Sequence, residues 1–337
     1  MTETGRGDRR PRGRPHPALA AVRSAVRPVL AECDPGDLVL LACSGGADST
    51  ALAEAAAFVG QRERLRVGAV VVDHGLQEGS AALGRTVGDR LRDLGLDPVE
   101  VVRVEVADSG EGTESAARAA RYAALDAAAD RLGARLVLLG HTRDDQAEQV
   151  LLGLARGSGA RSLAGMSPVR GRYRRPLLGV TREQTHAACA AAGLEVWQDP
   201  MNEDDSYARV RARRALRALE ADLGPGLGAA LARSADLLRA DADHLDVLAD
   251  DAVGALGPGP WDVGALDGLP RAVRTRVWRK LLLAAGAPAG QVSARHVEAC
   301  DRLLTHWHGQ GPVHAPGDLR VARSDGRVSM TPAARVE

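Results

Sequence analysis

Six consecutive residues near the N-terminus have the composition of a phosphate-binding loop. They follow the apolar run 38–43 and are Ser44, Gly45, Gly46, Ala47, Asp48 and Ser49. Glycines let the backbone curl so that amide N–H groups at a helix N-terminus point toward an anion. The two serines add hydroxyl donors, and the Asp48 carboxylate is suited to hold a Mg²⁺ ion bound to phosphates. The segment predicts a nucleotide pyrophosphate-binding loop, with Mg²⁺ at Asp48, in an enzyme that consumes ATP.

Other common nucleotide-binding loops do not occur in the sequence. It contains no G-x-x-x-x-G-K-[ST], and the single lysine, Lys280, lies outside any glycine-rich loop. No G-x-G-x-x-G follows an expected strand. The loop at 44–49 is therefore the candidate nucleotide site.

Polar residues also follow two other expected strands. Asp73 and His74 come after the run 67–72. The cluster after the run 136–139 comprises Gly140, His141, Asp144 and Asp145. A buried Asp–His pair, or capping of a helix by one of the two later aspartates, would explain either cluster alone. Because the carboxyl ends of parallel strands meet at one edge of a sheet, we expect both clusters to surround the same site as the loop.

Strand and helix periods alternate through the first half of the chain. Apolar or β-branched runs predict strands at 38–43, 67–72, 99–106 and 136–139, and helix-length segments follow them at 50–59, 81–94, 114–132 and 146–155. Strands separated in this way predict an α/β fold with a doubly wound parallel sheet covered on both faces.

The second half of the chain predicts a smaller, mainly helical domain that ends in a β-hairpin. Helices are expected at 182–192, at 210–252 with a break at 224–226, at 271–285 and at 294–305, and a loop at 168–175. The turn Ser324-Asp325-Gly326 between alternating runs predicts the hairpin. The expected organisation is a disordered basic tail at 1–17, an ATP-binding catalytic domain at 18–216 and a helical domain at 217–337.

The net charge of the 337 residues is zero, but the charges are unevenly distributed. Residues 156–217 contain twelve arginines against six acids, and 218–270 contain ten acids against two arginines. Solvated faces are often rich in arginine, but such asymmetry also suggests a polyanionic partner. No apolar run is long enough to span a bilayer, and the four scattered cysteines suit a reducing cytoplasm. Aromatic residues make up only 2 %, which argues against a base-stacking platform.

Together these motifs resemble those of a known family. The pattern S-G-G-x-D-S is typical of the PP-loop, or N-type, ATP pyrophosphatases, and the series along residues 36–217 resembles the tRNA(Ile)-lysidine synthetases. The series continues with Asp73-His74-Gly75-Leu76, Arg118-Ala-Ala-Arg121-Tyr122, His141-x-x-Asp144-Asp145-Gln146-Ala147-Glu148, Leu154-Ala-Arg156-Gly157-Ser158-Gly159, Arg175-Pro176-Leu177-Leu178, Trp197-Gln-Asp199-Pro200-Met-Asn202 and Arg209-x-Arg211-x-Arg213. One residue departs from the pattern, since Val210 stands where the family often has asparagine.

The resemblance implies a Rossmann-like fold and a two-step reaction that uses ATP, Mg²⁺, free L-lysine and a tRNA(Ile) with a CAU anticodon. The C2 oxygen of the wobble cytidine attacks the α-phosphate of ATP, and pyrophosphate leaves. The ε-amine of lysine then displaces AMP at C2 to give lysidine. Because the ordinary pKa of a lysine ammonium is about 10.4, some group must take its proton.

The resemblance also implies roles for individual residues. Catalytic roles fall to Asp48, His141, Asp145 and Arg209. ATP contacts fall to the loop Ser44, Gly45, Gly46, Ala47, Asp48 and Ser49, together with Asp73, His74 and Gly140. Contacts to tRNA fall to Arg118, Arg121, Tyr122, Arg156, Arg211 and Arg213, although the two arginines expected on the 114–132 helix would also suit a plain surface. We hypothesise that His141 and Asp145 orient the adenylated base and receive the proton, while Asp48 serves the pyrophosphate side.

Two alternatives stay open at this point. One is another PP-loop enzyme that modifies tRNA; a 2-thiocytidine enzyme would need paired C-x-x-C motifs, which the sequence lacks, and a glutamine-dependent amidotransferase would need a further domain. The other is a catalytically inactive RNA-binding protein on the same fold. The presence of Asp48, His141 and Asp145 argues against inactivity.

Overall fold

The structure is a computed structural model that describes residues 15–75, 79–104, 113–157, 159–199 and 204–332. Most of the expected tail (1–14) and parts of the quoted motifs (Leu76, Ser158 and residues 200–202) lie outside the described residues. The chain forms two compact units, Met1–Asp236 and Leu237–Glu337. The domain limits expected after residues 17 and 216 stay predictions.

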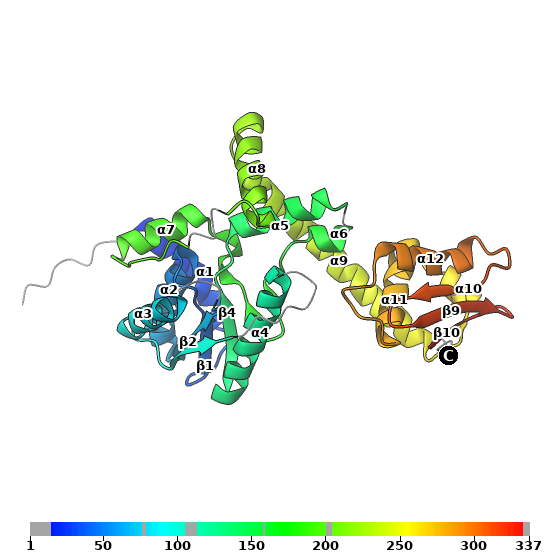
Figure 1. Ribbon diagram of the computed structural model, residues 1–337, viewed down its shortest axis with the longest axis horizontal. Coiled ribbons are helices and arrows are strands. Elements are labelled where there is room, and N and C mark those ends of the chain that lie inside the picture. The colour runs from blue at the N-terminus through cyan, green and yellow to red at the C-terminus, as the bar shows by residue number, and fades with distance from the viewer. Residues whose placement is uncertain (1–14, 76–78, 105–112, 158, 200–203, 333–337) are drawn as a thin grey trace, which may run out of the picture. The chain divides into compact units, whose positions relative to one another are not determined.

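A six-stranded sheet forms the centre of the N-terminal unit (Figure 1). In the order β3-β2-β1-β4-β6-β5, its strands are Val99–Arg103, Arg66–Asp73, Leu38–Ala42, Ala134–Leu139, Tyr173–Arg174 and Val169–Arg170. Neighbouring strands are parallel except for β5 and β6, which form a short hairpin where a loop was expected. The predicted doubly wound parallel sheet is confirmed. The strand order reverses between β1 and β4, and ligands of such sheets bind beside that point, at the carboxyl ends of the strands.

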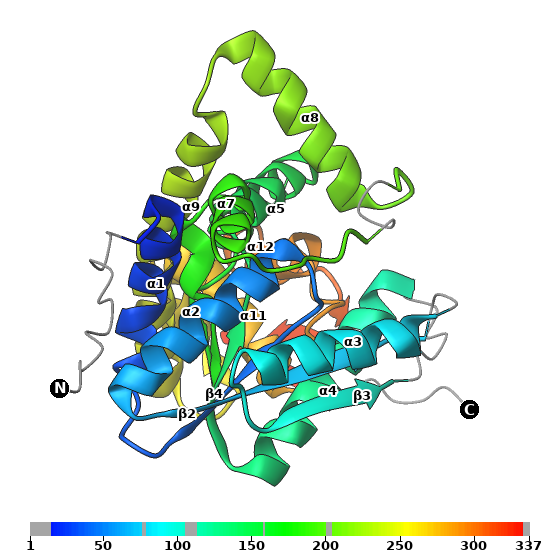
Figure 2. The same ribbon diagram turned by 90° about the vertical axis from the view of Figure 1, so that its left-hand side faces the viewer.

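Helices cover both faces of this sheet (Figure 2). One face packs against α1 (Pro17–Leu30), α2 (Ala47–Glu63), α3 (Ser80–Asp93) and α7 (Arg182–Ala191), and the other against α4 (Thr113–Leu132). Val39 and Leu41 of β1 belong to the first core, whereas Leu38 and Leu40 pack with Leu125 of α4 in the second. Because alternate residues of a strand point to opposite faces, an uninterrupted apolar run is buried on both.

Helix α1 differs from the sequence-based prediction, which has no helix at 17–30. It begins at Pro17, a residue favoured in the first turn, and buries Val22, Val26 and Leu30 at a spacing of four residues. An internal proline, Pro28, obscures this pattern in the sequence. The unit also contains α5 (Arg143–Ala155), α6 (Ala160–Leu163), a 3-10 helix at Pro176–Gly179, α8 (Ala208–Leu223) and the first part of α9 (Leu227–Leu256).

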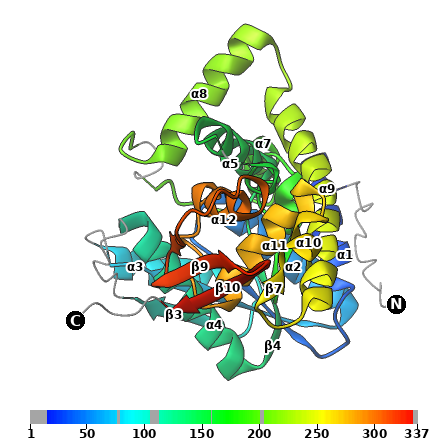
Figure 3. The same cartoon turned by 90° about the vertical axis from the view of Figure 1, so that its right-hand side faces the viewer.

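The C-terminal unit combines helices with a four-stranded antiparallel sheet (Figure 3). Its elements are the rest of α9, β7 (Trp261–Asp262), α10 (Val263–Asp267), α11 (Arg271–Ala284), α12 (Ala294–Thr305), β8 (Val313–Ala315), β9 (Leu319–Ser324) and β10 (Arg327–Pro332). The predicted hairpin is confirmed as β9–β10, whose turn residues Asp325 and Gly326 have φ of 49° and 72°. Positive φ at both central residues is what a two-residue hairpin turn requires.

A buried ion pair joins α11 to α12 in this unit. Arg274 Nε donates to Asp301 Oδ1 at 2.7 Å, and Trp278 Nε1 donates to the same oxygen at 3.2 Å. Removing one partner of such a pair would leave a buried charge without its counter-ion, which is destabilising. Within the described ranges, no helix is long and apolar enough to cross a membrane.

Candidate active site

The phosphate-binding segment leaves β1 and enters α2 through a tight turn closed by side-chain hydrogen bonds. Ser49 Oγ accepts a hydrogen bond from Ser44 N at 3.2 Å and donates one to Gly46 O at 3.0 Å. Helix α2 begins at Ala47, earlier than expected, and its N-cap residue, Gly46, offers no side-chain cap. The first amide groups of a helix have no partner within the helix, so those of α2 are available to an anionic ligand.

Gly45 is required by the shape of this turn. Its φ is +83°, and a Cβ at this position would lie 2.6 Å from Val87 Cγ2. Its carbonyl accepts a hydrogen bond from Trp197 N at 2.9 Å, which holds the chain after β6 and α7 against the loop. Only glycine takes this conformation without strain and without displacing α3.

We expect Gly45→Ala to weaken ATP binding by at least about 10-fold, because the turn must open to relieve the contact and its amide groups then lose their alignment. Isothermal titration calorimetry with ATP measures the change. Gly36→Ala is the matched control, since Gly36 has φ of +95° and open space around its Cβ position. Wild-type ATP affinity in Gly45→Ala would contradict the role of the loop.

The end of β4 lies directly against this loop. A Cβ at Gly140 would lie 3.2 Å from Ser49 N and 3.3 Å from the Asp48 carbonyl carbon. The absence of a side chain therefore lets the two backbones meet. This contact brings His141 and the start of α5 to the phosphate-binding turn, as the topology predicts.

Arg182, at the start of α7, joins the carboxylates at this edge of the sheet. Its Nη2 donates to Asp145 Oδ1 at 2.8 Å, its Nη1 donates to Glu148 Oε1 at 3.2 Å, and its Nε lies 3.8 Å from Asp48 Oδ2. Its backbone N–H donates to Asp144 Oδ2 at 2.8 Å. The side chains of Arg182 and Glu148 are 20 % and 3 % exposed, so water screens these charges little. Arg182 therefore sets the positions of the acidic groups.

Both oxygens of Asp145 are already bonded. Oδ2 accepts hydrogen bonds from Thr142 N at 2.8 Å and from Thr142 Oγ1 at 3.0 Å, which forms the capping box of α5, and Oδ1 is paired with Arg182. Burial raises the pKa of Asp145, but Arg182 and the Thr142 bonds outweigh it and hold the pKa below its usual range. These contacts suit an ionised carboxylate that fixes α5 and Arg182 in place.

Asp48 lies in the first turn of α2, next to the phosphate-binding amides. Its Oδ1 accepts a hydrogen bond from Thr185 Oγ1 of α7. Burial, together with repulsion from Asp145, raises the pKa of Asp48 despite that bond. A cation beside Asp48 would relieve the repulsion, so the residues fit Mg²⁺. Among the described residues no group of three or more His, Cys, Asp or Glu side chains is arranged to ligate a metal, so phosphate and water oxygens would have to complete its shell.

An arginine cluster near the ends of β4 and β6 consists of Arg118, Arg121, Arg175 and Arg209. Burial lowers the pKa values of Arg118 and Arg121, and their neighbours Arg175 and Arg209 lower them further. Arg175 is 5 % exposed, and its Nε has no hydrogen-bond partner in the described part of the chain. Over the same ranges, no carboxylate is among the groups that act on Arg121. Converging guanidinium groups of this kind are typical of phosphate-binding sites.

Two histidines border these arginines. Burial, opposed by Asp145 and reinforced by neighbouring arginines, lowers the pKa of His141 to about 3. Burial and Arg121 lower the pKa of His74. The Nδ1 atoms of both rings are buried and have no partner within the described residues. Because Arg121 acts on both histidines, the ends of β2 and β4 face one site. Asp73, beside His74, instead accepts a hydrogen bond from Gly75 N at 2.9 Å and stabilises its own turn.

The depressed pKa of His141 predicts how stability depends on pH. Below about pH 6.5 an unfolded histidine binds a proton that the folded one does not, so the unfolded chain is favoured as the pH falls toward 3. Because of this histidine, the free energy of unfolding of the wild type should be about 1 kcal/mol lower at pH 5.5 than at pH 7.5. We expect His141→Asn to remove that difference in urea denaturation at the two pH values. His244→Asn, in α9, is the control, and an unchanged pH response in His141→Asn would refute the prediction.

The three arginines of α8 that the motif groups together have different surroundings in the structure. Arg209 lies at the arginine cluster, whereas Arg213 Nε donates to Glu148 Oε1 at 2.8 Å. Arg211 is exposed and donates to two backbone carbonyls of the preceding turn at 2.7 Å each. Residues two apart on a helix face different directions, which explains why Arg211 points away from the other two. Arg156, the C-cap of α5, is also exposed. The roles expected for these residues in tRNA binding stay predictions.

Four residues of the site have no role in the sequence-based prediction: Arg182, Thr185, Glu148 and Arg175. Glu148 and Arg175 lie within recognised motifs, but nothing in their spacing shows which charges they meet. Thr181 and Gln184 form a capping box that marks the start of α7. That signal reveals the helix but not the carboxylates that Arg182 contacts.

A phosphate-binding turn at the switch point of a parallel sheet, flanked by carboxylates and by an arginine cluster, defines a nucleotide-binding enzyme of the PP-loop class. A family model for the PP-loop domain matches residues 20–219, and one for the TilS substrate binding domain matches residues 262–329. The chain belongs to the tRNA(Ile)-lysidine synthase family. It is 57 % identical to the tRNA(Ile)-lysidine synthase of Thermobifida fusca over 94 % of this chain and 98 % of the relative. It is 52 % identical to the tRNA(Ile)-lysidine synthase of Streptomyces coelicolor, over 93 % of this chain and 98 % of that relative.

A solved structure shows the same fold. It is the U34-tRNA thiolase NcsA from Methanococcus maripaludis with its [4Fe-4S] cluster. The match covers 66 % of this chain and 80 % of the thiolase chain, with a TM-score of 0.55. The two sequences are 17 % identical. The likeness therefore concerns the fold alone.

Proposed function

We propose that this protein is an ATP-dependent ligase that converts the wobble cytidine of a tRNA(Ile) with a CAU anticodon to lysidine, with free L-lysine as the second substrate. One observation carries the proposal. The phosphate-binding turn, Asp48 and the arginine cluster lie around the carboxyl ends of β1 and β4, in a chain that belongs to the tRNA(Ile)-lysidine synthase family.

In the first step, the turn at 44–49 and the N-terminus of α2 bind the phosphates of ATP. The C2 oxygen of cytidine attacks the α-phosphate, and the bond to pyrophosphate breaks. Negative charge grows on the departing pyrophosphate, and the amide groups of the turn together with Arg121 and Arg209 would stabilise it. Asp48 would hold Mg²⁺ against the phosphates, where the ion supplies further charge neutralisation.

In the second step, the lysine ε-amine attacks C2 and AMP leaves. The amine must be neutral, and nearby Arg175 and Arg209 lower the pKa of an incoming ammonium by repulsion. We favour His141 over Asp145 as the proton acceptor, because its Nδ1 is unpartnered in the described chain whereas Asp145 is fully bonded. Phosphates bound at the arginine cluster would offset its charge and raise the basicity of His141.

Release of AMP tests the proposal against the two alternatives. We expect AMP only when ATP, L-lysine and a tRNA(Ile) with a CAU anticodon are all present, and little with a tRNA(Met) of the same anticodon. An inactive RNA-binding protein would bind the tRNA and release no AMP. A different PP-loop enzyme would release AMP without a requirement for lysine.

A further inference from the structure

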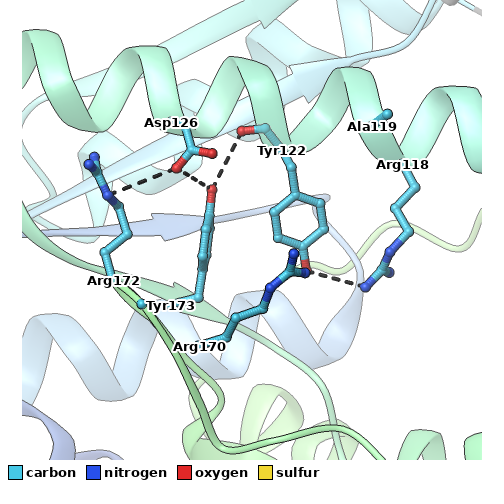
Figure 4. Close-up of a pocket in the computed structure, with 8 residues that line it drawn as sticks. Arg118, Ala119, Tyr122, Asp126, Arg170, Arg172 and Tyr173 are labelled. Carbon is cyan, nitrogen blue, oxygen red and sulfur yellow. Dashed lines mark hydrogen bonds and ion pairs between the residues drawn. The ribbon is translucent and has the colours of Figure 1, made fainter. Parts of the chain in front are cut away.

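A hollow of about 530 Å³ lies between α4 and the β5–β6 hairpin, beside the arginine cluster (Figure 4). Its wall includes Arg118, Tyr122, Asp126, Arg170, Arg172 and Tyr173. The two tyrosine rings meet edge to face, with centroids 5.0 Å apart. Tyr173 donates a hydrogen bond to Asp126 Oδ1 at 2.8 Å, which fixes the floor of the hollow.

Positive charge converges on the Tyr122 ring. The guanidinium carbons of Arg118, Arg121 and Arg170 lie 5.0, 5.7 and 5.7 Å from its centroid. Within the described ranges, no carboxylate pairs with any of these three arginines. By contrast, Arg172 is neutralised by Asp130, 2.6 Å away. Three like charges around one ring repel one another, so an anion placed among them would be strongly favoured.

The Tyr122 hydroxyl connects the hollow to the catalytic edge. It accepts hydrogen bonds from Arg118 Nη2 at 3.4 Å and from the buried Arg175 Nη2 at 3.3 Å. Its own hydrogen has no acceptor among the described residues and is free to bond a ligand oxygen. The ligand would thus combine an oxyanion with a group that tolerates an aromatic wall.

We propose that this hollow binds a phosphodiester group of the RNA substrate next to, but distinct from, the nucleotide that reacts. The proposal rests on the proposed function in that the substrate is RNA. A phosphodiester supplies the negative charge that Arg118 and Arg170 lack, and an adjacent base can lie against Tyr122. The hollow would hold the strand while the neighbouring nucleotide reaches the end of β4.

Arg170→Ala tests the proposal most cleanly, because the Arg170 side chain lies near the Tyr122 ring and forms no hydrogen bond or ion pair with the described part of the chain. We expect the full-length variant to bind the anticodon stem-loop of tRNA(Ile) about 10-fold more weakly by fluorescence anisotropy. The slope of log Kd against the logarithm of the salt concentration should fall by the amount that corresponds to roughly one phosphate contact. ATP affinity should stay at the wild-type level. Arg66→Ala, which removes an exposed arginine at the opposite end of β2, is the matched control.

Wild-type RNA affinity and salt dependence in Arg170→Ala would overturn the proposal. So would an equal loss in Arg66→Ala, which would show only a general charge effect, or a loss of ATP affinity instead of RNA affinity. RNA binding is measured without turnover, so this result is independent of whether lysidine is formed. If the wild type binds the stem-loop but makes no lysidine, the proposed function fails while the hollow is still tested.

Discussion

Replacing Arg182 with alanine is expected to lower the free energy of unfolding by about 3 kcal/mol and kcat/KM by at least about 100-fold. The change leaves Asp48, Asp145 and Glu148 close together without the cation that joins them, and an uncompensated buried charge is costly. The carboxylates would separate or take up protons, and the turn that binds ATP would shift with them. Urea denaturation followed by circular dichroism, and steady-state AMP release, measure the two effects.

Two further variants separate this role from a general loss of charge. Arg182→Lys keeps the charge but cannot reach three carboxylates at once, so both losses should be intermediate. Arg302→Ala removes an exposed pair with Glu298, 3.8 Å away, and should cost less than about 1 kcal/mol. If Arg182→Ala were as stable and as active as Arg302→Ala, Arg182 would not organise the site.

Asp48→Asn, by contrast, should lower activity without lowering stability. Asparagine can still accept the hydrogen bond from Thr185, and the change removes a buried negative charge that Asp145 repels. Stability should therefore be unchanged or slightly higher. Pyrophosphate release should fall by at least about 100-fold, because no carboxylate then holds Mg²⁺ against the phosphates.

Mg²⁺ provides a readout for this variant that does not depend on turnover. In calorimetric titrations, Mg²⁺ should strengthen ATP binding to the wild type and have little effect on Asp48→Asn. Asp89→Asn, at a carboxylate that is 73 % exposed, is the control. Equal enhancement by Mg²⁺ in Asp48→Asn and the wild type would assign the metal to other ligands.

The sequence predicts the centre of the site well because the information there is local. A buried strand, two glycines and a helix occupy adjacent residues, and the rule for ligand positions in parallel sheets brings Asp73 and His141 to the same edge. The short hairpin β5–β6 escapes prediction because each strand has two residues, too few to show an alternating pattern. Its arginines therefore appear in the sequence only as part of a basic stretch.

Charge pairing is the part that the sequence does not reveal. Asp145 is compatible with either a catalytic base or a helix cap from its position alone, and the structure places it in a capping box and against Arg182. That contact joins α5 to α7 across 37 residues of the chain, which no local pattern encodes. The spacing of Arg209, Arg211 and Arg213 likewise suggests one joint role, whereas helical geometry directs Arg211 away from the other two, and Arg213 pairs with Glu148.

The nucleoside composition of the product tRNA tests the central claim most directly. The protein would be incubated with ATP, Mg²⁺, isotopically labelled L-lysine and a tRNA(Ile) transcript with a CAU anticodon, and the digested RNA analysed by mass spectrometry. We predict that one cytidine per tRNA gains the mass of lysine less one water, carries the label and maps to the wobble position. An unmodified wobble cytidine, with the RNA bound and ATP intact, would contradict the claim.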